Sequence, residues 1–426
     1  MSAPETEVLI VGAGLAGLAC ALHLHEDAVP VRVLEASDGV GGRVRTDRVD
    51  GFRLDRGFQV LLTAYPETRR ILDYAALDLR PFLPGAVVRR SGRFHELSDP
   101  WRRPTRVVST LFSGVGTLAD RLRIARYRAR VGSGSLEALF QRPETTARDR
   151  LRSEGFSEAM VDAFFRPLFG GVLLDRALAS SSRMLDFVFR MMAEGDVVLP
   201  GAGMGAIPDQ MARRLPEGTI RLRARVASVT SREVRLASGE AIAARAVVVA
   251  TEGPEAARLT GQIPVPSSRS VTALYFAAER APVAEPILIL DGDGRGPVNN
   301  LCVPSQVAPS YAPPGSALVS ASVLEGPDDP GALEGEVRGQ LTEWFGTVVD
   351  SWRLLRTYRI AHAQPDQTPP ALDPVERPVE LAGGLFVCGD HRDTASLHGA
   401  LLSGRRAAEA VTRSLEGVAS RGRPDS

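Results

Sequence analysis

The sequence contains no lysine, so all 51 of its basic side chains other than histidine are arginines. The simplest interpretation of this bias is the base composition of the genome. The absence nevertheless excludes several kinds of chemistry. A Schiff base to lysine, a phosphate-binding P-loop lysine and a lysine general base are all impossible in this chain.

Cysteine is also scarce. Cys20, Cys302 and Cys388 lie far apart in the sequence, and no C-x-x-C motif is present. This pattern predicts neither a disulfide framework nor a cysteine-rich metal site, so we expect no metal and a reducing compartment, which favours a cytoplasmic location. The N-terminus lacks a basic segment before its first apolar run, and we therefore expect no signal peptide.

Long hydrophobic runs are absent as well. The longest uncharged stretch, residues 296–324, is interrupted by five prolines and cannot form a transmembrane helix. The formal net charge is +0, so no overall field favours nucleic acid or a membrane. A chain of 426 residues, 44% of them hydrophobic, is long enough for two or three globular domains.

The first recognisable motif is "VLIVGAGLAGLACALHL", an apolar run followed by Gly12, Gly14 and Gly17 in a G-x-G-x-x-G pattern. The run predicts a parallel strand buried on both faces, and the residues after it predict a helix. These glycines allow a tight turn, close approach of a pyrophosphate, and close packing of helix on strand. A second predicted strand ends in Glu35, where a carboxylate can bind a ribose diol.

Gly41, Gly42 and Arg43 follow Glu35 in an E-x-x-x-x-x-G-G-R pattern. With the preceding motif, this stretch resembles the flavoprotein superfamily of amine oxidases, protoporphyrinogen oxidases and phytoene desaturases. The resemblance implies FAD as the cofactor, with Arg43 reaching the pyrophosphate from the side opposite the glycine turn. It also implies an α/β fold, with a Rossmann-like FAD-binding domain of the glutathione-reductase type and a discontinuous α+β substrate domain.

The C-terminal region contains a second strand–loop–helix pattern, "GGLFVCGD" followed by "SLHGALLSGRRAAEAV". It has no G-x-G-x-x-G and no acidic strand end after it, so we interpret it as the other side of the first site. The N-terminus of a helix suits the negative charge of a reduced flavin. By resemblance, Asp390 holds the ribityl or pyrophosphate part of FAD, which requires the two ends of the chain to meet.

The superfamily resemblance implies a set of cofactor contacts distributed over both ends of the chain. They are Gly12, Gly14, Leu15, Ala16, Gly17, Glu35, Ala36, Gly41, Gly42, Arg43, Gly57, Phe58, Gln59, Val226, Ala250, Gly389, Asp390, Ser396, Leu397, Gly399 and Ala400. Within this set, Gly57, Phe58 and Gln59 are expected near the flavin ring, and the Val226 backbone near the adenine.

The same resemblance divides the chain into interleaved parts. We expect the FAD-binding domain in residues 1–64, 197–255 and 376–416. We expect a helical part of the substrate domain in residues 65–196, its sheet part in residues 256–375, and a flexible tail in residues 417–426.

Residues 101–130 contain eight arginines and one aspartate around an uncharged stretch. A basic, partly apolar segment can contact the inner face of an anionic membrane peripherally. The alternative is an ordinary solvated face of a helix pair. The oligomeric state is left open by the sequence.

The motifs describe the cofactor rather than the substrate. Many amine oxidases of the superfamily place a lysine near the flavin, which this chain cannot do, and desaturases do not depend on it. We therefore predict an FAD-dependent oxidoreductase that dehydrogenates or isomerises a small lipophilic, polyene-like substrate by hydride transfer to flavin N5. Tyr358, His362 and His398 are the candidate catalytic residues.

Two alternatives stay open. The first is an oxidase of an amine or porphyrinogen that uses oxygen. The second, from another class, is a flavin-binding module that senses redox state without turnover.

Overall fold

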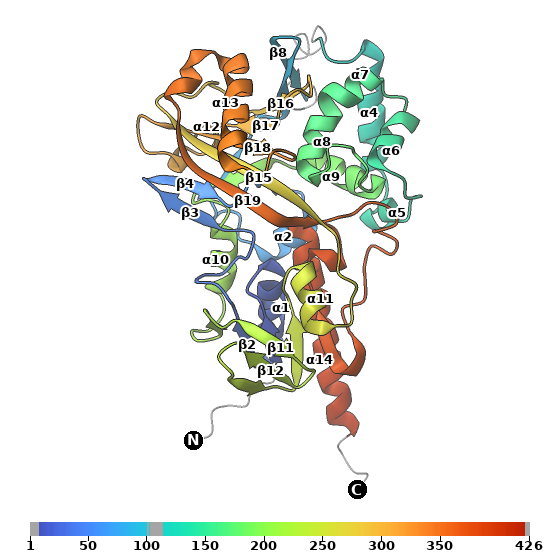
Figure 1. The fold of residues 1–426 in the computed structure, drawn as a ribbon. Coiled ribbons are helices and arrows are strands. Elements are labelled where there is room, and N and C mark those ends of the chain that lie inside the picture. The colour runs from blue at the N-terminus through green and yellow to red at the C-terminus, as the bar shows by residue number, and fades with distance from the viewer. Residues whose placement is uncertain (1–7, 100–101, 103–113, 422–426) are drawn as a thin grey trace.

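A computed structural model describes residues 8–99, 102 and 114–421, with side chains in the last helix described as far as residue 416. Two halves are visible in Figure 1. One contains a parallel sheet with helices on it, and the other contains a mostly antiparallel sheet beside a group of helices. The long strands β15 (Ser268–Ala278) and β19 (Arg353–Pro365) run between the halves.

The parallel sheet has the strand order β10-β2-β1-β14-β20. Its strands are β1 (Val8–Val11), β2 (Val31–Leu34), β10 (Ile220–Arg221), β14 (Ala246–Val249) and β20 (Leu385–Val387). The central strands β1 and β14 are buried along their whole length, as their continuous apolar sequences predict. The two ends of the chain and its middle thus contribute to one sheet, and the predicted fold class is confirmed.

Helices α1 (Leu15–Glu26) and α14 (Leu397–Arg421) pack against each other beside this sheet. Their contact is close, because a Cβ added at Gly404 would lie 2.3 Å from the Ala16 carbonyl oxygen. This half also contains α10 (Ala206–Ala212), α11 (Gly253–Thr260), and a small sheet of β11 (Val226–Val229), β12 (Glu233–Leu236) and β13 (Ala241–Ala243).

The second large sheet has the order β19-β15-β18-β17-β16-β7-β8 and is antiparallel except for the β16–β7 pair. Its other strands are β7 (Gly85–Arg90), β8 (Arg93–Ser98), β16 (Leu288–Asp291), β17 (Val298–Cys302) and β18 (Ala317–Val323). Helix α13 (Pro330–Phe345) packs on one face, where Val337 and Leu341 join a core with Phe276 and Val319.

A group of helices lies beside this sheet (Figure 1). They are α4 (Leu118–Gly132), α5 (Leu136–Phe140), α6 (Ala147–Ser153), α7 (Glu158–Met160), α8 (Arg166–Leu173) and α9 (Ser182–Glu194). A π-helical turn, Val161–Phe165, joins α7 to α8. Such turns are rare and are frequent at functional sites.

Shorter elements connect the two halves. They are β3 (Thr46–Val49), β4 (Phe52–Asp55), β5 (Leu61–Leu62), α2 (Pro66–Ile71), β6 (Leu79–Pro81) and β9 (Val197–Pro200), while α12 (Pro304–Val307) lies between β17 and β18 in the second half. Strand β9 pairs with both β5 and β6.

The structure differs from two sequence-based expectations. Residues 65–196 are not purely helical, because residues 79–98 form β6, β7 and β8. The expected tail at 417–426 begins inside α14, which continues to Arg421 because no residue before that point breaks the helix. Much of the Arg-rich segment, at 100–101 and 103–113, lies outside the described residues. In the described part of the chain, no helix combines the length and the apolar character needed to cross a bilayer.

Candidate active site

One large cavity of about 980 Å³ joins the two halves of the molecule. Its size is at the upper end of the range of roughly 300–1,000 Å³ usual for small-molecule sites, which suits a cofactor together with a substrate. We call the part bounded by the parallel sheet, α1 and the start of α14 the cofactor section. We call the part bounded by the antiparallel sheet and helices α8 and α9 the apolar section.

The glycine turn after β1 borders the cofactor section. Gly12 has φ +106°, and a Cβ there would lie 2.8 Å from the Ala250 carbonyl oxygen. A Cβ at Gly17 would lie 2.0 Å from the Gly12 carbonyl oxygen, so this glycine permits close packing of α1. In contrast, a Cβ at Gly14 would meet nothing within 4 Å, which leaves space beside the first turn of α1. The N–H groups of a first helical turn can bind phosphate in such a space.

Glu35 lies at the end of β2 and is 9% exposed. One carboxylate oxygen accepts a hydrogen bond from the Ala13 N–H at 2.7 Å, and the other accepts from the Ser37 N–H at 2.8 Å. The carboxylate therefore fixes the glycine turn against the next loop. Each oxygen retains a further lone pair for a ligand such as a ribose diol.

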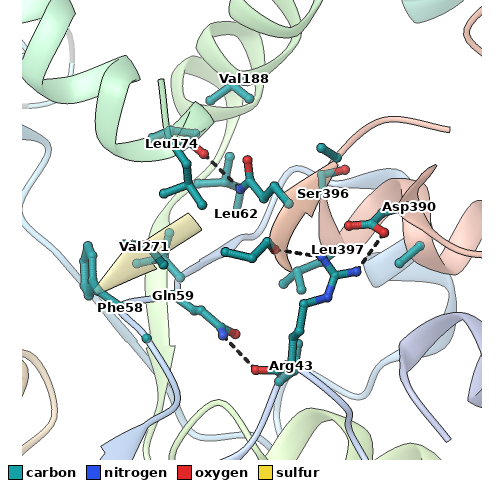
Figure 2. Close-up of a pocket in the computed structure, with 18 of the residues that line it drawn as sticks. Arg43, Phe58, Gln59, Leu62, Leu174, Val188, Val271, Asp390, Ser396 and Leu397 are labelled. Atoms are coloured by element: carbon teal, nitrogen blue, oxygen red, sulfur yellow. Dashed lines mark hydrogen bonds and ion pairs between the residues drawn. The ribbon is translucent and has the colours of Figure 1, made fainter. Parts of the chain in front are cut away.

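Arg43 connects the two ends of the chain. Its guanidinium donates to the Asp390 carboxylate at 2.7 Å and to the Ala363 carbonyl at 2.7 Å (Figure 2). Burial opposes the charge of Arg43, but the Asp390 carboxylate outweighs it and holds the pKa of Arg43 above its ordinary value. The two residues predicted to bind FAD from opposite ends of the sequence therefore form an ion pair beside the cavity.

Gln59 fixes the next loop. Its side-chain NH₂ donates to the Arg43 carbonyl at 2.9 Å and to the Arg56 carbonyl at 3.1 Å, as Figure 2 shows in part. Gly57, with φ +93°, and Phe58 line the cavity beside it. The loop after β4 is thereby held against the segment that carries Arg43.

The start of α14 forms the opposite wall of the cofactor section, where Ser396, Leu397 and Ala400 line the cavity. The Ser396 hydroxyl accepts from the Gly399 N–H at 3.0 Å, which caps the first turn. Gly399 itself packs away from the cavity, since a Cβ there would lie 2.1 Å from the Thr394 carbonyl oxygen.

Nearly all of the predicted cofactor contacts line this one cavity. Those that do so are Gly12, Gly14, Leu15, Ala16, Glu35, Ala36, Gly41, Gly42, Arg43, Gly57, Phe58, Gln59, Val226, Ala250, Gly389, Asp390, Ser396, Leu397 and Ala400. Gly17 and Gly399 instead shape the two helix starts. The open face at Gly14, the carboxylate at Glu35 and the two helix starts fit an extended dinucleotide such as FAD.

The apolar section is walled by aliphatic, aromatic and methionine side chains. They include Phe58, Val60, Leu62, Phe82, Leu83, Met160, Phe164, Leu168, Phe169, Val172, Leu174, Val188, Phe189, Met192, Val197, Val271, Leu288 and Ile360. Figure 2 shows Leu62, Leu174 and Val188 across the cavity from Arg43 and Asp390. Phe164 belongs to the π-helical turn.

At its far end the apolar section reaches polar side chains near α4. Asp99, Arg102, Arg121 and Arg128 line the cavity there, and Arg102 is exposed. Arg128 pairs with Asp99 at 2.7 Å, and Arg102 pairs with Asp196. Among the described residues, the cavity thus approaches the surface at the Arg-rich part of the chain.

None of the three predicted catalytic residues lines this cavity. The Tyr358 hydroxyl donates to the Asp47 carboxylate at 2.8 Å, and burial together with that carboxylate raises the pKa of Tyr358 to about 12. His362 is exposed on β19 and borders only a small neighbouring void. The contact with Asp47 favours a structural role for Tyr358, while Gln364 and Ala363 of the same strand do line the cavity.

His398 is buried behind the cavity wall. Its Nδ1 accepts from the Glu67 N–H at 3.3 Å, and its ring lies 5.9 Å from that of Tyr65 and 5.5 Å from that of Phe187. Burial lowers the pKa of His398 to about 4, so the ring is neutral near pH 7. The ring that does line the cavity is that of Tyr65, which the sequence did not single out because it is a lone tyrosine before Pro66.

Comparisons with known proteins place this site in context. Residues 15–412 match the family described as flavin containing amine oxidoreductase. Over 58 residues, 14% of this chain and 11% of the relative, the chain is 50% identical to phytoene dehydrogenase of Streptomyces griseus. Over 168 residues, 39% of this chain and 30% of the relative, it is 26% identical to protoporphyrinogen oxidase 2 of Arabidopsis thaliana.

Among solved structures, cyclohexylamine oxidase from Brevibacterium oxydans IH-35A superposes with a TM-score of 0.71 at 16% identity, covering 97% of this chain and 100% of that one. This likeness shows the fold. The sequence matches to the two curated relatives span less than a third of the length of each.

Proposed function

Because the chain belongs to the family of flavin-containing amine oxidoreductases, we propose that it dehydrogenates or isomerises an apolar, polyene-like substrate. The chain is an FAD-dependent oxidoreductase by this membership. Bound FAD supplies the redox chemistry, and the chain supplies position and a dry environment. The proposal concerns the class of substrate.

The apolar section of the cavity carries the proposal. Its walls present almost only hydrocarbon and thioether groups, from Phe58 to Ile360, directly beside the cofactor section. Burial of apolar substrate surface against such walls contributes roughly 25 cal/mol per Å². The same walls exclude water from the reacting carbon, and they hold the substrate in one orientation against the cofactor.

The section offers little to a cationic substrate. A protonated amine loses its hydration there and needs a carboxylate in return. At the far end Asp99 is already paired with Arg128. These features favour a neutral apolar substrate over an amine, and the chain has no lysine to place beside the flavin.

Anaerobic mixing of the FAD-loaded protein with three substrate classes tests the proposal. The classes are a C20 to C40 polyene, cyclohexylamine and a porphyrinogen. Loss of the visible flavin absorption with the polyene alone supports dehydrogenation. Formation of a product that requires reduced flavin, with no net transfer of electrons between the polyene and the flavin, supports isomerisation.

The other results of this mixing experiment contradict the proposal. Reduction by cyclohexylamine or the porphyrinogen, with none by the polyene, supports the alternative of an amine or porphyrinogen oxidase. No response to any of the three supports a flavin-binding module without turnover.

We also propose that α4 contacts an anionic membrane surface peripherally. Leu118 and Leu122, one helical turn apart, are 64% and 75% exposed, and the Arg126 side chain on the next turn is 73% exposed. Apolar side chains flanked by arginine suit the headgroup region of an anionic bilayer. An apolar substrate dissolved in that bilayer then lies close to the end of the cavity that Arg102 and Arg121 line.

Cosedimentation with phosphatidylglycerol vesicles tests this contact. Replacing both Leu118 and Leu122 by serine is expected to weaken binding about tenfold, because two apolar side chains leave the bilayer. Val265→Ser is the matched control, since Val265 is 72% exposed at another place. Equal binding of all three proteins, or no binding by any of them, contradicts the proposed contact.

A further inference from the structure

Tyr65 differs from the other residues of the cavity wall in the way it is held. It directly precedes α2, and its ring stacks on that of Phe187 at 5.6 Å with an angle of 19° between the planes. The ring of His398 lies 5.9 Å away at 23°. The Tyr65 side chain is therefore fixed by packing on two helices, α9 and α14, and lines the cavity between the two sections.

The Tyr65 hydroxyl has no hydrogen-bond partner within the described part of the chain, although the residue is only 6% exposed. Other polar side chains of the apolar section are engaged. The Asn300 oxygen accepts from Asn299 at 2.9 Å, and the Gln364 amide donates to the Val172 carbonyl at 3.0 Å.

The state of the phenol defines what it can bind. Burial raises the pKa of Tyr65 above its ordinary value, so the hydroxyl is neutral near pH 7 and can donate one hydrogen bond. The neighbouring rings do not compete for it, because Phe187 has no polar atom and the His398 Nδ1 already accepts from the Glu67 N–H. The unused donor therefore points to an acceptor on the occupant of the cavity.

We propose that the substrate is an apolar molecule bearing a hydroxyl or carbonyl oxygen, which accepts a hydrogen bond from Tyr65. This inference rests on the proposed function and narrows its substrate class from a pure hydrocarbon to an oxygenated lipid. Tyr65 then fixes which carbon of the chain faces the cofactor section, since one polar contact in an apolar cavity sets the position of the whole ligand.

Titration of the FAD-loaded protein with a matched pair of ligands tests the inference. The pair is farnesol, a C15 alcohol, and farnesene, the corresponding hydrocarbon, and binding is followed by the change in the flavin absorption spectrum. Tyr65→Phe removes the hydroxyl and keeps the stacked ring. Tyr74→Phe is the matched control, because the Tyr74 hydroxyl bonds Thr68 at 2.7 Å and does not line the cavity.

We expect the unsubstituted protein to bind farnesol about tenfold more tightly than farnesene, the upper range for one neutral hydrogen bond. Tyr65→Phe is expected to abolish this preference by weakening farnesol binding alone. Its affinity for FAD and its flavin spectrum without ligand should not change. Tyr74→Phe should keep the full preference.

Three results overturn the inference, and they separate it from the proposed function. If both ligands bind equally and Tyr65→Phe changes neither affinity, the hydroxyl contacts only water. The proposed function then still stands with a hydrocarbon substrate. If Tyr65→Phe lowers the affinity for FAD, the hydroxyl binds the cofactor instead. If neither ligand binds, the apolar substrate class itself fails, and the inference fails with it.

Discussion

The cofactor section and the apolar section of the cavity are built from different parts of the polypeptide. The cofactor section uses backbone groups, glycines and a few charged side chains, at turns where Arg43 meets Asp390 and Gly12 packs against Ala250 from distant parts of the sequence. The apolar section uses aliphatic, aromatic and methionine side chains from β15, β16, β19, α8 and α9. Substitutions should therefore be tolerated very differently in the two sections.

Gly14→Asp tests the cofactor section with the largest expected effect. A side chain there enters the space beside the first turn of α1, and a carboxylate also repels a pyrophosphate. We expect the affinity for FAD to fall about 1,000-fold, or about 4 kcal/mol, in an isothermal titration. Aspartate is a good N-cap residue, so the apoprotein should keep its melting temperature.

Gly335→Asp is the matched control for this change. A Cβ at Gly335, in α13, also meets nothing within 4 Å, but Gly335 does not line the cavity. Unchanged FAD binding by Gly14→Asp, or an equal loss in Gly335→Asp, contradicts the placement of the pyrophosphate.

Most of the cofactor section could be predicted from the sequence because its requirements are local. A strand, a turn that needs glycine, a helix start and an acidic strand end occur at fixed spacing, so Gly12 and Glu35 can be identified without the fold. Asp390 was predicted only by resemblance, since its contact with Arg43 depends on how the two ends of the chain come together.

The apolar section could not be predicted in the same way. Many leucines, valines and phenylalanines of the chain are buried, and no spacing separates those beside a cavity from those in the core. Strands β7 and β8 form a local hairpin around Ser91 and Gly92 that the sequence-based interpretation overlooked, whereas the pairing of β7 with the distant strand β16 has no local signal. His398 was assigned a place near the flavin from its position at the start of α14, but the direction of its side chain follows from packing on Tyr65 and Phe187.

His398, buried behind the cavity wall at Tyr65, predicts a pH effect on stability. Burial lowers its pKa from 6.5 to about 4 in the folded chain, beside Glu67 and Arg405. The unfolded chain therefore binds a proton near pH 6.5 that the folded chain does not bind. The stability that the neutral ring contributes is present above pH 6.5 and is lost as the pH falls toward 4, by up to about 3 kcal/mol.

Urea unfolding of the unsubstituted protein and of His398→Gln between pH 7 and pH 4 measures this loss. The glutamine side chain can accept from the Glu67 N–H but does not titrate. Between pH 7 and pH 4, we expect the unfolding free energy of the unsubstituted protein to fall by about 3 kcal/mol more than that of His398→Gln. Parallel curves for the two proteins would mean that His398 has the same pKa in the folded and unfolded chains.

Asp390→Asn tests the ion pair that joins the two ends of the chain. The variant leaves the Arg43 guanidinium beside a neutral amide, and the Asp390 side chain is only 8% exposed. Breaking a buried pair costs about 3–5 kcal/mol, and we expect about 2 kcal/mol here because the Arg43 side chain is 31% exposed. Urea unfolding of the apoprotein measures this value directly, and Asp38→Asn, which breaks the exposed pair with Arg45, should destabilise the protein less than Asp390→Asn does.

Val188→Phe tests the apolar section and has the smallest expected effect. Val188 lines the cavity on α9, opposite Arg43 and Asp390 in Figure 2, so a phenyl ring there narrows the space for an apolar ligand. We expect farnesol to bind about tenfold more weakly, or by about 1.4 kcal/mol, while the affinity for FAD stays the same. Val188→Ala, which enlarges the same space, should leave both affinities within about twofold, because the wall remains apolar. An equal loss of farnesol and FAD binding in Val188→Phe would mean that the cofactor extends into the apolar section, and the two sections would then be one site.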